Sequence, residues 1–400
     1  MNVSHARGRY VRRTWKADPT IYAPPKHRRP CTYDAFVPEP VVGLRLSLPG
    51  QVAGVVSEAE NAIADLNRTA GPELIPLARL LLRTESIASS KVEGMQIDAR
   101  SLARAEANQE TGRKVGSDAA EILANIDAMQ LSIERASTID KFRQRDLKDI
   151  HRVLLDRAPN AHIAGQLRTS QNWIGGNDYT PCGATFVPPP HEAVGGLLRD
   201  LCALVNDDTL PPLIQAAIAH AQFETIHPFE DGNGRTGRAL VQVILRRRRL
   251  APAFVPPISV ILAADTDRYV RGLTLFRENR LAEWIELFAA ASAQAAQLAA
   301  RYAERVAALQ EDWREQLRNH AAPRSDSAAW RLISVLPAHP IITIAVATAV
   351  TQRTRPAVAN AIAELEAAGV LVATSQAARN RSWEASGLLD LIVGLEAGAD

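Results

Sequence analysis

The sequence predicts a mainly α-helical fold with a small β-hairpin flap and a C-terminal winged helix-turn-helix domain. Through most of the chain, apolar residues recur at three- and four-residue steps, which is the period of an amphipathic helix. One stretch rich in glycine, proline and asparagine, residues 171–190, interrupts that pattern. After the polar link AAPRSDS at residues 321–327, short helical segments precede two short β-capable segments. These three observations define a helical body, a flap and a C-terminal unit.

The helical body is predicted from its apolar periodicity alone. Between Thr266 and Asn319 the pattern continues as two or three further helices. The run Arg246–Arg249 ends one helix, where cations favour the helix dipole, so a solvated helix end is favoured over a nucleic-acid patch. The predicted helices before residue 264 are Val52–Asn67, Glu73–Val92, Asp118–Arg135, Thr138–Arg157, His191–Asn206, Pro211–Thr225 and Thr236–Leu250.

The flap is predicted in QNWIGGNDYTPCGATFVPPP, residues 171–190. Two β-capable pieces, Asn172–Ile174 and Ala184–Val187, are separated by turn-forming residues. We expect them to pair as a hairpin on the helical body.

The C-terminal unit shows the element order of a winged helix. Short helices are predicted at Trp330–Leu336 and Thr343–Val350, a longer one at Thr354–Gly369, and strands in VLVATS and RSWEAS. Four arginines of this unit could face DNA, but residues 324–400 carry six basic and seven acidic residues, a poor balance for a DNA-binding module. Dimerisation or target docking is an alternative use. The four are Arg353, Arg355, Arg379 and Arg381.

Bulk composition is that of a globular protein of two to four domains, with 400 residues and a net charge of +2. The first 31 residues form a basic arm with eight Lys or Arg and one Asp. Such an arm can contact an anionic partner, but a poorly ordered, solubilising tail is the favoured interpretation.

Cysteine use and hydropathy bear on the compartment. Cys31, Cys182 and Cys202 are far apart and lack CxxC spacing, which argues against a disulfide framework or a zinc site and suits a reducing cytoplasm. The N-terminus lacks the apolar core of a signal peptide. No uncharged apolar run reaches the ~20 residues of a membrane span. We therefore expect a cytoplasmic protein without membrane contact.

The candidate site is HPFEDGNGRTGR, residues 227–238. Gly232 and Gly234 let the backbone approach an anion and direct successive N–H groups toward it. The helix that starts near Arg235 adds its positive end. Arg235 and Arg238 are three residues apart, so both can clamp phosphate oxygens. This combination predicts a polyphosphate site.

Two further residues of this stretch add chemistry. Asp231 is placed to hold a Mg²⁺ that bridges phosphates, and His227 can take a proton from an incoming hydroxyl. Each feature alone is more often structural: a turn, a helix end or a surface arginine pair. Their combination in twelve residues between two helices favours the functional interpretation.

The stretch resembles the Fic motif, HxFx(D/E)GNGRxxR, at every fixed position. GQLRTSQNWIGG at residues 165–176 and ATFVPPP at 184–190 look like the flap region of that family. The resemblance extends from Thr32 to about Leu262 and implies a Fic-fold helical bundle. It also implies that AMP moves from ATP to a Ser, Thr or Tyr hydroxyl of a target protein. His227 would be the general base, Asp231 the Mg²⁺ ligand and Phe229 an apolar anchor.

The remaining motif residues would bind the nucleotide. Asn233 and the amides of Gly232 and Gly234 would surround the α-phosphate. Arg235 and Arg238 would bind the outer phosphates, with Arg238 nearest the γ-phosphate. The base-binding residues are not evident, so transfer of UMP, phosphocholine or phosphate stays open.

The flap would hold the target as an added β-strand and read mostly its backbone. The flap residues that this role singles out are Ile174, Gly175, Thr185, Phe186 and Val187.

An inhibitory pattern of the family, (S/T)xxxE(G/N), is matched by SSKVEG from Ser89 to Gly94. The implied contact joins Glu93 to Arg238 and keeps Arg238 from orienting the γ-phosphate. A plain helix end, with Gly94 as its C-cap and Lys91 on the dipole, is compatible with the same residues. In some relatives this glutamate also supports removal of the modification.

These assignments divide the chain into a basic arm (1–31), an N-terminal helical region with the inhibitory helix (32–112), a catalytic core (113–263), linking helices (264–320) and a winged-helix domain (321–400). Self-modification and formation of a homodimer are both compatible with this organisation. The competing hypothesis is a DNA-binding regulator with a degenerate nucleotide domain.

Overall fold

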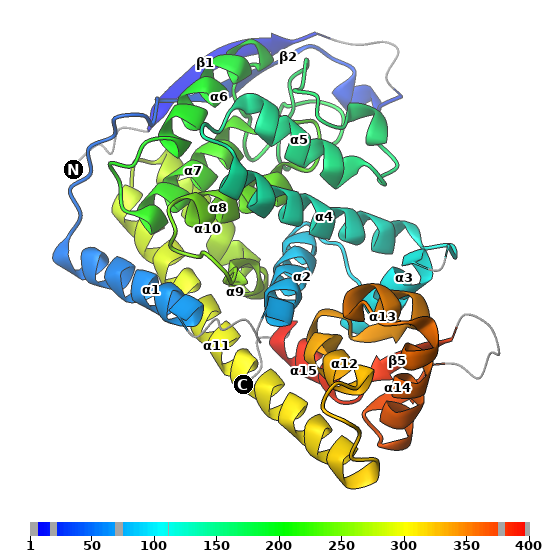
Figure 1. The fold of residues 1–400 in the computed structure, drawn as a ribbon. Coiled ribbons are helices and arrows are strands. Elements are labelled where there is room, and N and C mark those ends of the chain that lie inside the picture. Colours follow the sequence, from blue (N-terminus) through cyan, green and yellow to red (C-terminus); the bar gives the residue numbers. More distant parts are fainter. Residues whose placement is uncertain (1–6, 17–21, 69–74, 111, 375–380, 397–400) are drawn as a thin grey trace.

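The structure, a computed structural model, describes residues 7–16, 22–68, 75–110, 112–374 and 381–396. Helices make up most of it, with two small β-sheets (Figure 1). The prediction of a mainly α-helical fold is confirmed.

The elements of the body follow one another along the chain as β1 (Gly8–Trp15), β2 (Cys31–Pro38), α1 (Gly50–Arg68), α2 (Ile75–Val92), α3 (Ala99–Glu110), α4 (Ser117–Thr138), α5 (Gln144–Leu155), α6 (His191–Val205), α7 (Pro212–Ile226), α8 (Asn233–Arg247), α9 (Ile258–Ala264), α10 (Thr266–Arg277) and α11 (Leu281–His320). The C-terminal unit contains α12 (Ala328–Val335), β3 (Ile341–Thr343), α13 (Ile344–Thr351), α14 (Arg355–Ala367), β4 (Leu371–Ala373), β5 (Ser382–Ala385) and α15 (Leu388–Glu396).

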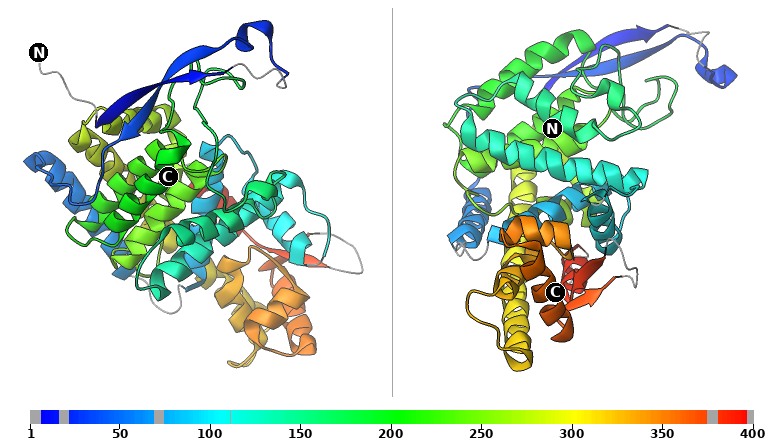
Figure 2. Two further views of the ribbon diagram at one scale, coloured as in Figure 1. Left: turned by 90° about the horizontal axis from the view of Figure 1, so that it is seen from above. Right: turned by 45° about the vertical axis from the view of Figure 1, so that its right-hand side comes forward.

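Two central helices, α7 and α8, form the core of the body. Every residue from Leu213 to Ile226 and from Asn233 to Leu245 is buried. A helix that is buried on all sides must be small or apolar all round, and α7 meets this with alanines on several faces. Helices α4, α5 and α6 pack on one part of this pair, and α10 and α11 on another (Figures 1 and 2). The loop between α7 and α8 is therefore held rigidly at both ends.

The long helix α11 joins the body to the C-terminal unit (Figure 1). Near its start, Trp284 Nε1 donates to the Ala217 carbonyl of α7 at 2.9 Å. Near its end, Trp313 Nε1 donates to the Ser386 carbonyl at 3.2 Å. Helices α10 and α11 fulfil the expectation of two or three helices between residues 266 and 319. None of the described helices is both long and apolar enough to cross a membrane.

The C-terminal unit packs against α2, α3 and the end of α11. Its three-stranded sheet has the order β3-β5-β4. Arg100 of α3 pairs with Asp390 at 3.0 Å and also contacts Glu384. The predicted helices and the two final strands are present, and β3 and α15 are additional. The winged-helix assignment stays a prediction, and Arg379 lies outside the described residues.

The N-terminal arm differs from expectation. Residues 8–15 are not a loose tail but strand β1, which pairs antiparallel with β2 from Gly8 opposite Pro38 to Trp15 opposite Cys31. The ring of Tyr10 lies 5.2 Å from that of Phe36 in the opposite strand. The β1–β2 hairpin extends beyond the helices, above the body (Figure 2). The sequence pattern did not predict this strand, because its β-favouring Tyr, Val, Thr and Trp residues are interspersed with arginines.

The cysteines also differ from expectation, because Cys31 and Cys182 form a disulfide with their Cα atoms 6.4 Å apart. The expectation of no disulfide is therefore wrong. The two residues are 151 positions apart in sequence, but β2 and the flap are neighbours, since Phe36 N donates to the Val187 carbonyl at 2.9 Å. Cys202 is free and buried. The disulfide removes one argument for a reducing compartment, so cytoplasmic location stays a prediction.

Candidate active site

His227 begins the loop between α7 and α8 in a left-handed conformation, with φ 49° and ψ 61°. Its N–H donates to the Phe223 carbonyl at 2.9 Å and closes the last turn of α7. Within the described structure, Nδ1 of its ring has no hydrogen-bond partner. Burial, together with the charge of Arg168, lowers the pKa of His227 to about 4. The imidazole is therefore neutral at pH 7 and can accept a proton.

The backbone of this loop is held by residues that the sequence analysis did not single out. Arg168 Nε donates to the His227 carbonyl at 2.8 Å, and Asn172 Nδ2 donates to the Phe229 carbonyl at 3.0 Å. The ring of His151 stacks on Phe229 at 3.7 Å, and its Nε2 lies 2.9 Å from the Asp231 carbonyl. Arg168 and Asn172 lie in the GQLRTSQNWIGG stretch, so the resemblance of that stretch to the family's flap region could have pointed to them. No sequence signal pointed to His151.

Phe229 and Asn233 fasten the loop to itself. Phe229 is fully buried, as expected of an apolar anchor. Asn233 Nδ2 donates to the Phe229 carbonyl at 2.9 Å, and its Oδ1 accepts from the Phe229 N–H at 2.9 Å. The carboxamide that the resemblance assigned to the α-phosphate is therefore occupied inside the loop. Its contribution here is to shape the loop.

Asp231 stands at the rim of the loop with its side chain half exposed. Its carboxylate accepts from the Gly232 N–H at 2.6 Å and from Asn160 Nδ2 at 2.7 Å. The described residues contain no group of three or more His, Cys, Asp or Glu that could hold a metal ion. Protein sites for Mg²⁺ commonly use only one or two carboxylates and take the other ligands from phosphates and water. A single solvent-accessible Asp231 beside the predicted phosphate site fits that chemistry.

The N-terminus of α8 is the predicted anion site. Gly232, with φ 72°, is its N-cap. A Cβ added at Gly234 would lie 1.9 Å from Oε1 of Glu93, so the Glu93 carboxylate sits against the first turn of α8. Arg235 is buried; its guanidinium lies 3.7 Å from Glu121, and its Nη1 lies 3.8 Å from the Met95 sulfur. A carboxylate occupies the place where N–H groups and a positive helix end favour an anion.

Arg238, the last motif residue, is hydrogen-bonded to the end of α2. Its Nε donates to Ser89 Oγ at 2.8 Å, and its Nη2 donates to the Ser89 carbonyl at 2.7 Å and to Glu93 Oε1 at 2.8 Å. Gly94, with φ 84°, ends the helix there. The contact between Glu93 and Arg238, 145 residues apart, is the one that the sequence pattern implied.

Two buried carboxyl groups near Arg238 were not predicted. Burial raises the pKa of Glu224 to about 8 and that of Glu85 to about 7. Glu85 accepts from Ser259 N at 2.8 Å and from Ser259 Oγ at 2.6 Å, joining α2 to α9. Glu224 fits only because residue 237 is glycine: a Cβ there would lie 2.3 Å from Glu224 Oε1. The sequence could not predict the raised pKa of either carboxyl group, because their burial depends on packing between distant helices.

The flap contains the predicted pair as one β-bridge. Ile174 N donates to the Phe186 carbonyl at 2.8 Å, and Phe186 N donates to the Ile174 carbonyl at 3.1 Å. Ile174, Gly175 and Thr185 are exposed. Val187 is buried, and its carbonyl accepts from β2. The unpredicted β1–β2 hairpin therefore occupies the Val187 carbonyl, and the role of the flap in holding a target stays a prediction.

Comparison with known proteins places this site in a family. The model described as "Fic/DOC family" matches residues 141–245, which include the whole loop, and "Fic/DOC family N-terminal" matches residues 54–134. The second match includes Ser89 and Glu93. Neither match extends into the C-terminal unit.

Two curated relatives are named for an activity. "Protein adenylyltransferase fic-1" of Caenorhabditis elegans is 33% identical over 166 residues, 41% of this chain and 28% of that protein. "Protein adenylyltransferase Fic" of Drosophila yakuba is 27% identical over 203 residues, 49% of this chain and 38% of that protein. The matches thus span well under half of the relatives' length. A crystal structure of a Fic family protein from Desulfovibrio desulfuricans shares the fold, with a TM-score of 0.52, 20% identity, and coverage of 86% of this chain and 98% of that one.

Proposed function

The chain is a member of the Fic/DOC family, and on that basis we propose that it is a protein adenylyltransferase held in an inhibited state by Glu93. The observation that carries the proposal is the neutral His227 beside the N-terminus of α8. Arg235 and Arg238 of the same helix are buried close to this N-terminus. The relatives' names support adenylyl transfer as the reaction. The donor is ATP and the acceptor is a hydroxyl of a protein.

In the proposed reaction, the oxygen of a Ser, Thr or Tyr hydroxyl attacks the α-phosphorus of ATP. A new phosphorus–oxygen bond forms, the bond to pyrophosphate breaks, and the hydroxyl proton moves to His227. The amides at the start of α8 hold the phosphates, and the loop contacts of Arg168 and His151 keep these groups positioned. Mg²⁺ at Asp231 would neutralise phosphate charge when bound.

Inhibition is proposed from the position of the Glu93 carboxylate. It lies against Gly234 and accepts from Arg238 Nη2, so it competes with phosphate for both. A negative charge there also repels an incoming polyphosphate. The proposed inhibited state keeps Arg238 from binding the γ-phosphate.

The direct test is transfer of label from α-labelled ATP, with the full chain and with lysate as a source of targets. Glu93→Gly should raise labelling, and His227→Ala in the Glu93→Gly background should abolish it. His162→Ala, at an exposed histidine, is the matched control and should leave labelling unchanged. Failure of Glu93→Gly to label any protein would contradict the transferase proposal.

Mass spectrometry of the labelled products identifies the transferred group and the modified residue, including self-modification. Competition by ATP, UTP and CDP-choline for thermal stabilisation tests the donor. Incubating pre-modified target with wild-type protein and with Glu93→Gly tests whether Glu93 supports removal of the modification. Faster removal by the wild type would favour that second activity.

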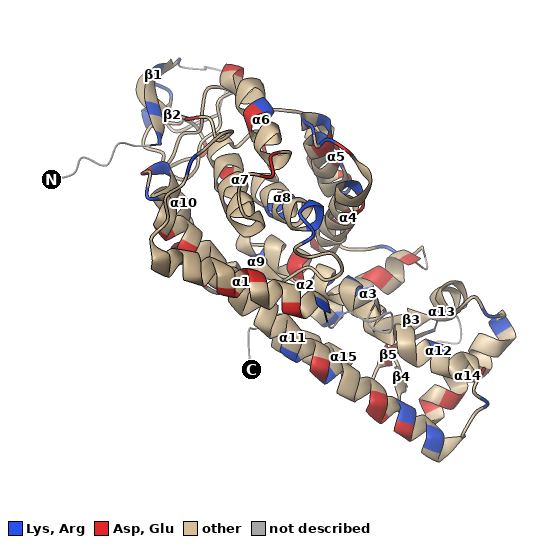
Figure 3. Cartoon of the chain, turned by 60° about the vertical axis from the view of Figure 1, so that its left-hand side comes forward, with Lys and Arg blue, Asp and Glu red and all other residues tan. Residues whose placement is uncertain are grey.

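DNA binding is the weaker alternative. Acidic and basic residues alternate along the lower part of α11 and are mixed in the C-terminal unit (Figure 3). Arg381 pairs with Glu366 at 3.3 Å and lies over Trp383, and Arg353 donates to the Asp326 carbonyl at 3.0 Å. A gel shift with random duplex at low salt tests this alternative, and clear binding would revive it.

A further inference from the structure

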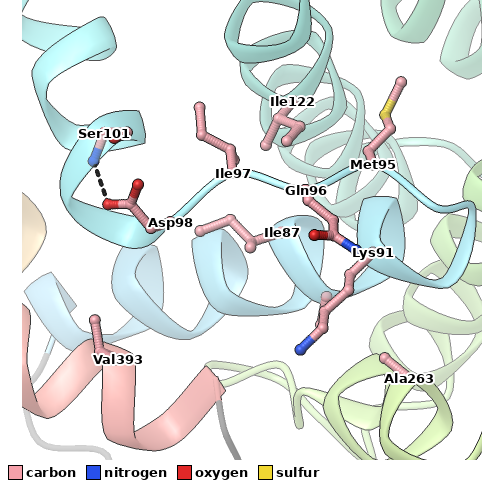
Figure 4. A pocket seen from close by; sticks show the side chains of 11 residues that line it. Ile87, Lys91, Met95, Gln96, Ile97, Asp98, Ser101, Ile122, Ala263 and Val393 are labelled. Carbon is pink, nitrogen blue, oxygen red and sulfur yellow. Dashed lines mark hydrogen bonds between the residues drawn. The ribbon is translucent and has the colours of Figure 1, made fainter.

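A cavity of about 630 Å³ lies beside the last turn of α2 (Figure 4). Its lining comes from α2, the segment 95–98, α3, α4, α9 and α15, so it joins the inhibitory helix to the C-terminal unit. Cavities of roughly 300–1,000 Å³ hold small organic ligands. It is separate from the loop of His227, none of whose residues line it.

The lining is mainly apolar, with a few polar groups. Its apolar side chains are Ile87, Ala88, Met95, Ile97, Ile122, Ala263 and Val393. Figure 4 shows Lys91 at the end of α2, Gln96 in the segment that follows it, and Asp98 turned toward Ser101. The Ser101 N–H donates to Asp98 at 2.8 Å, so that carboxylate already caps α3.

Lys91 provides the cation among the lining residues and is exposed to solvent, and the Asp98 carboxylate is a second, negative charge. In the described part of the chain, neither its ammonium nor the Gln96 carboxamide makes a hydrogen bond or ion pair. A cation and an amide donor beside an apolar wall match a molecule with an apolar body and one anionic group. A neutral apolar molecule would leave the exposed Lys91 ammonium to water alone and gain no ion pair.

The cavity is connected to the active site through the segment after α2. Met95 lines the cavity, and its sulfur contacts Arg235 at 3.8 Å. The Met95 N–H donates to the Ser90 carbonyl at 3.1 Å, which keeps the turn at Gly94 closed. Glu93 lies between two lining residues, Lys91 and Met95, so the walls of the cavity and the position of Glu93 depend on the same turn.

We infer that this cavity binds a small amphiphilic monoanion, with its carboxylate at Lys91 and Gln96, and that binding strengthens the Glu93–Arg238 contact. The cavity is present in this structure, in which Glu93 holds Arg238. A ligand favours the state whose walls fit it, so it acts as a negative effector. By linkage, ATP weakens its binding to the same degree. The effector role rests on the proposed inhibition by Glu93; the binding site does not.

Binding is tested first, without reference to activity, with decanoate as the probe and the full chain at neutral pH. Titration calorimetry and thermal unfolding should both report binding of decanoate, with decanol binding more weakly. Lys91→Gln should weaken decanoate binding about fivefold, as loss of a partly exposed ion pair does. Val393→Trp fills the cavity from a half-exposed position and should abolish binding while the fold is retained.

Three results would overturn the site: no decanoate binding, equal binding of decanol, or binding unaffected by both substitutions. The effector role is tested by labelling with Ser89→Ala, in which inhibition is expected to be partial. Decanoate should lower that labelling severalfold and leave Glu93→Gly unaffected, although decanoate still binds to it. Unchanged Ser89→Ala labelling despite bound decanoate would overturn the effector role. Absence of labelling in Glu93→Gly would instead count against the proposed transferase.

Discussion

Glu93 and Arg238 share one ion pair but differ in their access to solvent. The Arg238 side chain is 2% exposed, whereas the Glu93 side chain is 39% exposed. A pair with one member near water contributes modestly to stability, because solvent competes for the exposed partner. Glu93 is therefore the member that can leave, and Arg238 stays in place beneath the N-terminus of α8. This asymmetry suits a contact that, in the proposed mechanism, breaks when ATP binds.

Ser89 holds the same guanidinium through its hydroxyl, and Ser89→Ala removes that bond while Glu93 remains. A hydrogen bond to a charged group contributes about 1.5–3 kcal/mol. We expect labelling from α-labelled ATP to rise roughly tenfold, less than in Glu93→Gly. Ser90→Ala is the matched control, because Ser90 is buried on the same turn but its hydroxyl bonds to Ser86 and Asn125. An equal rise in Ser90→Ala would mean that loosening of α2, rather than the Ser89 bond, releases the site.

His227 sets the expected acid limit of the reaction. Burial lowers its pKa to about 4, so the neutral base persists as the pH falls below the ordinary histidine value of about 6.5. In Glu93→Gly, kcat/KM for labelling should therefore decline only as the pH approaches about 4. Circular dichroism at each pH separates this from unfolding, since His151 and His220 are also neutral in the fold. A decline centred near 6.5 would show that His227 is not the limiting base.

At the scale of elements, α2 is held from both of its sides. Ser89 and Glu93 bind α8, and Glu85 binds Ser259 at the start of α9. The inhibitory helix is therefore clamped by side-chain contacts one and two turns apart. Release of Glu93 leaves the Glu85 contact in place, so we expect opening to involve the last turn of α2 and the segment that follows.

Glu85 makes the stability of this clamp depend on pH. Burial raises its folded pKa to about 7, above the unfolded value of about 4.3. Its stabilising contribution is therefore present below pH 4.3 and is lost as the pH rises through 7. In Glu85→Gln the amide oxygen can accept from Ser259 N and the amide NH2 can donate to Ser259 Oγ, and the group does not titrate. Relative to wild type, its free energy of unfolding should therefore increase by on the order of 2 kcal/mol from pH 5 to 7.5. Urea unfolding at both values measures this, and a constant difference would contradict the raised pKa.

At the scale of the whole molecule, the N-terminal hairpin and the flap act as one unit. The disulfide joins the start of β2 to the flap, and Phe36 bonds to Val187. Trp15 and Trp173 lie edge to face at 5.6 Å, and the guanidinium of Arg277 lies 4.0 Å from the Phe186 ring. The surface proposed to hold a target therefore includes a strand that precedes every helix in the sequence.

A peptide map without reductant should contain a linked pair with Cys31 and Cys182, and Cys202 should resist alkylation because burial raises the pKa of its thiol to about 12. Reduction, or Cys31→Ser with Cys182→Ser, should lower the free energy of unfolding by about 2–4 kcal/mol. Hydrogen exchange should increase in residues 172–187 and stay constant in 227–238. Exchange that is unchanged in the flap would show that noncovalent contacts alone hold it.

Prediction from sequence was most successful where the signal was local. The apolar period identified most helices of the body but not α3 and α9, and the motif at residues 227–238 identified the loop. The pattern at Ser89–Gly94 pointed to Arg238 because the family supplies the partner. The sequence missed β1 and the disulfide, since both depend on pairing between distant residues. It also assigned Val187 and the Asn233 carboxamide to ligands, whereas packing uses both internally.

The sequence by itself determined a helical body, a polyphosphate-type loop with one histidine, and a glutamate that ends an upstream helix. These follow from periodicity and from residue types at fixed spacing, which act over one or two turns. Only the tertiary structure decided the protonation of His227, the burial of Glu85 and Glu224, the cover over the flap and the cavity beside α2. Each depends on which distant segments exclude water from a group, and burial of that kind is a property of packing.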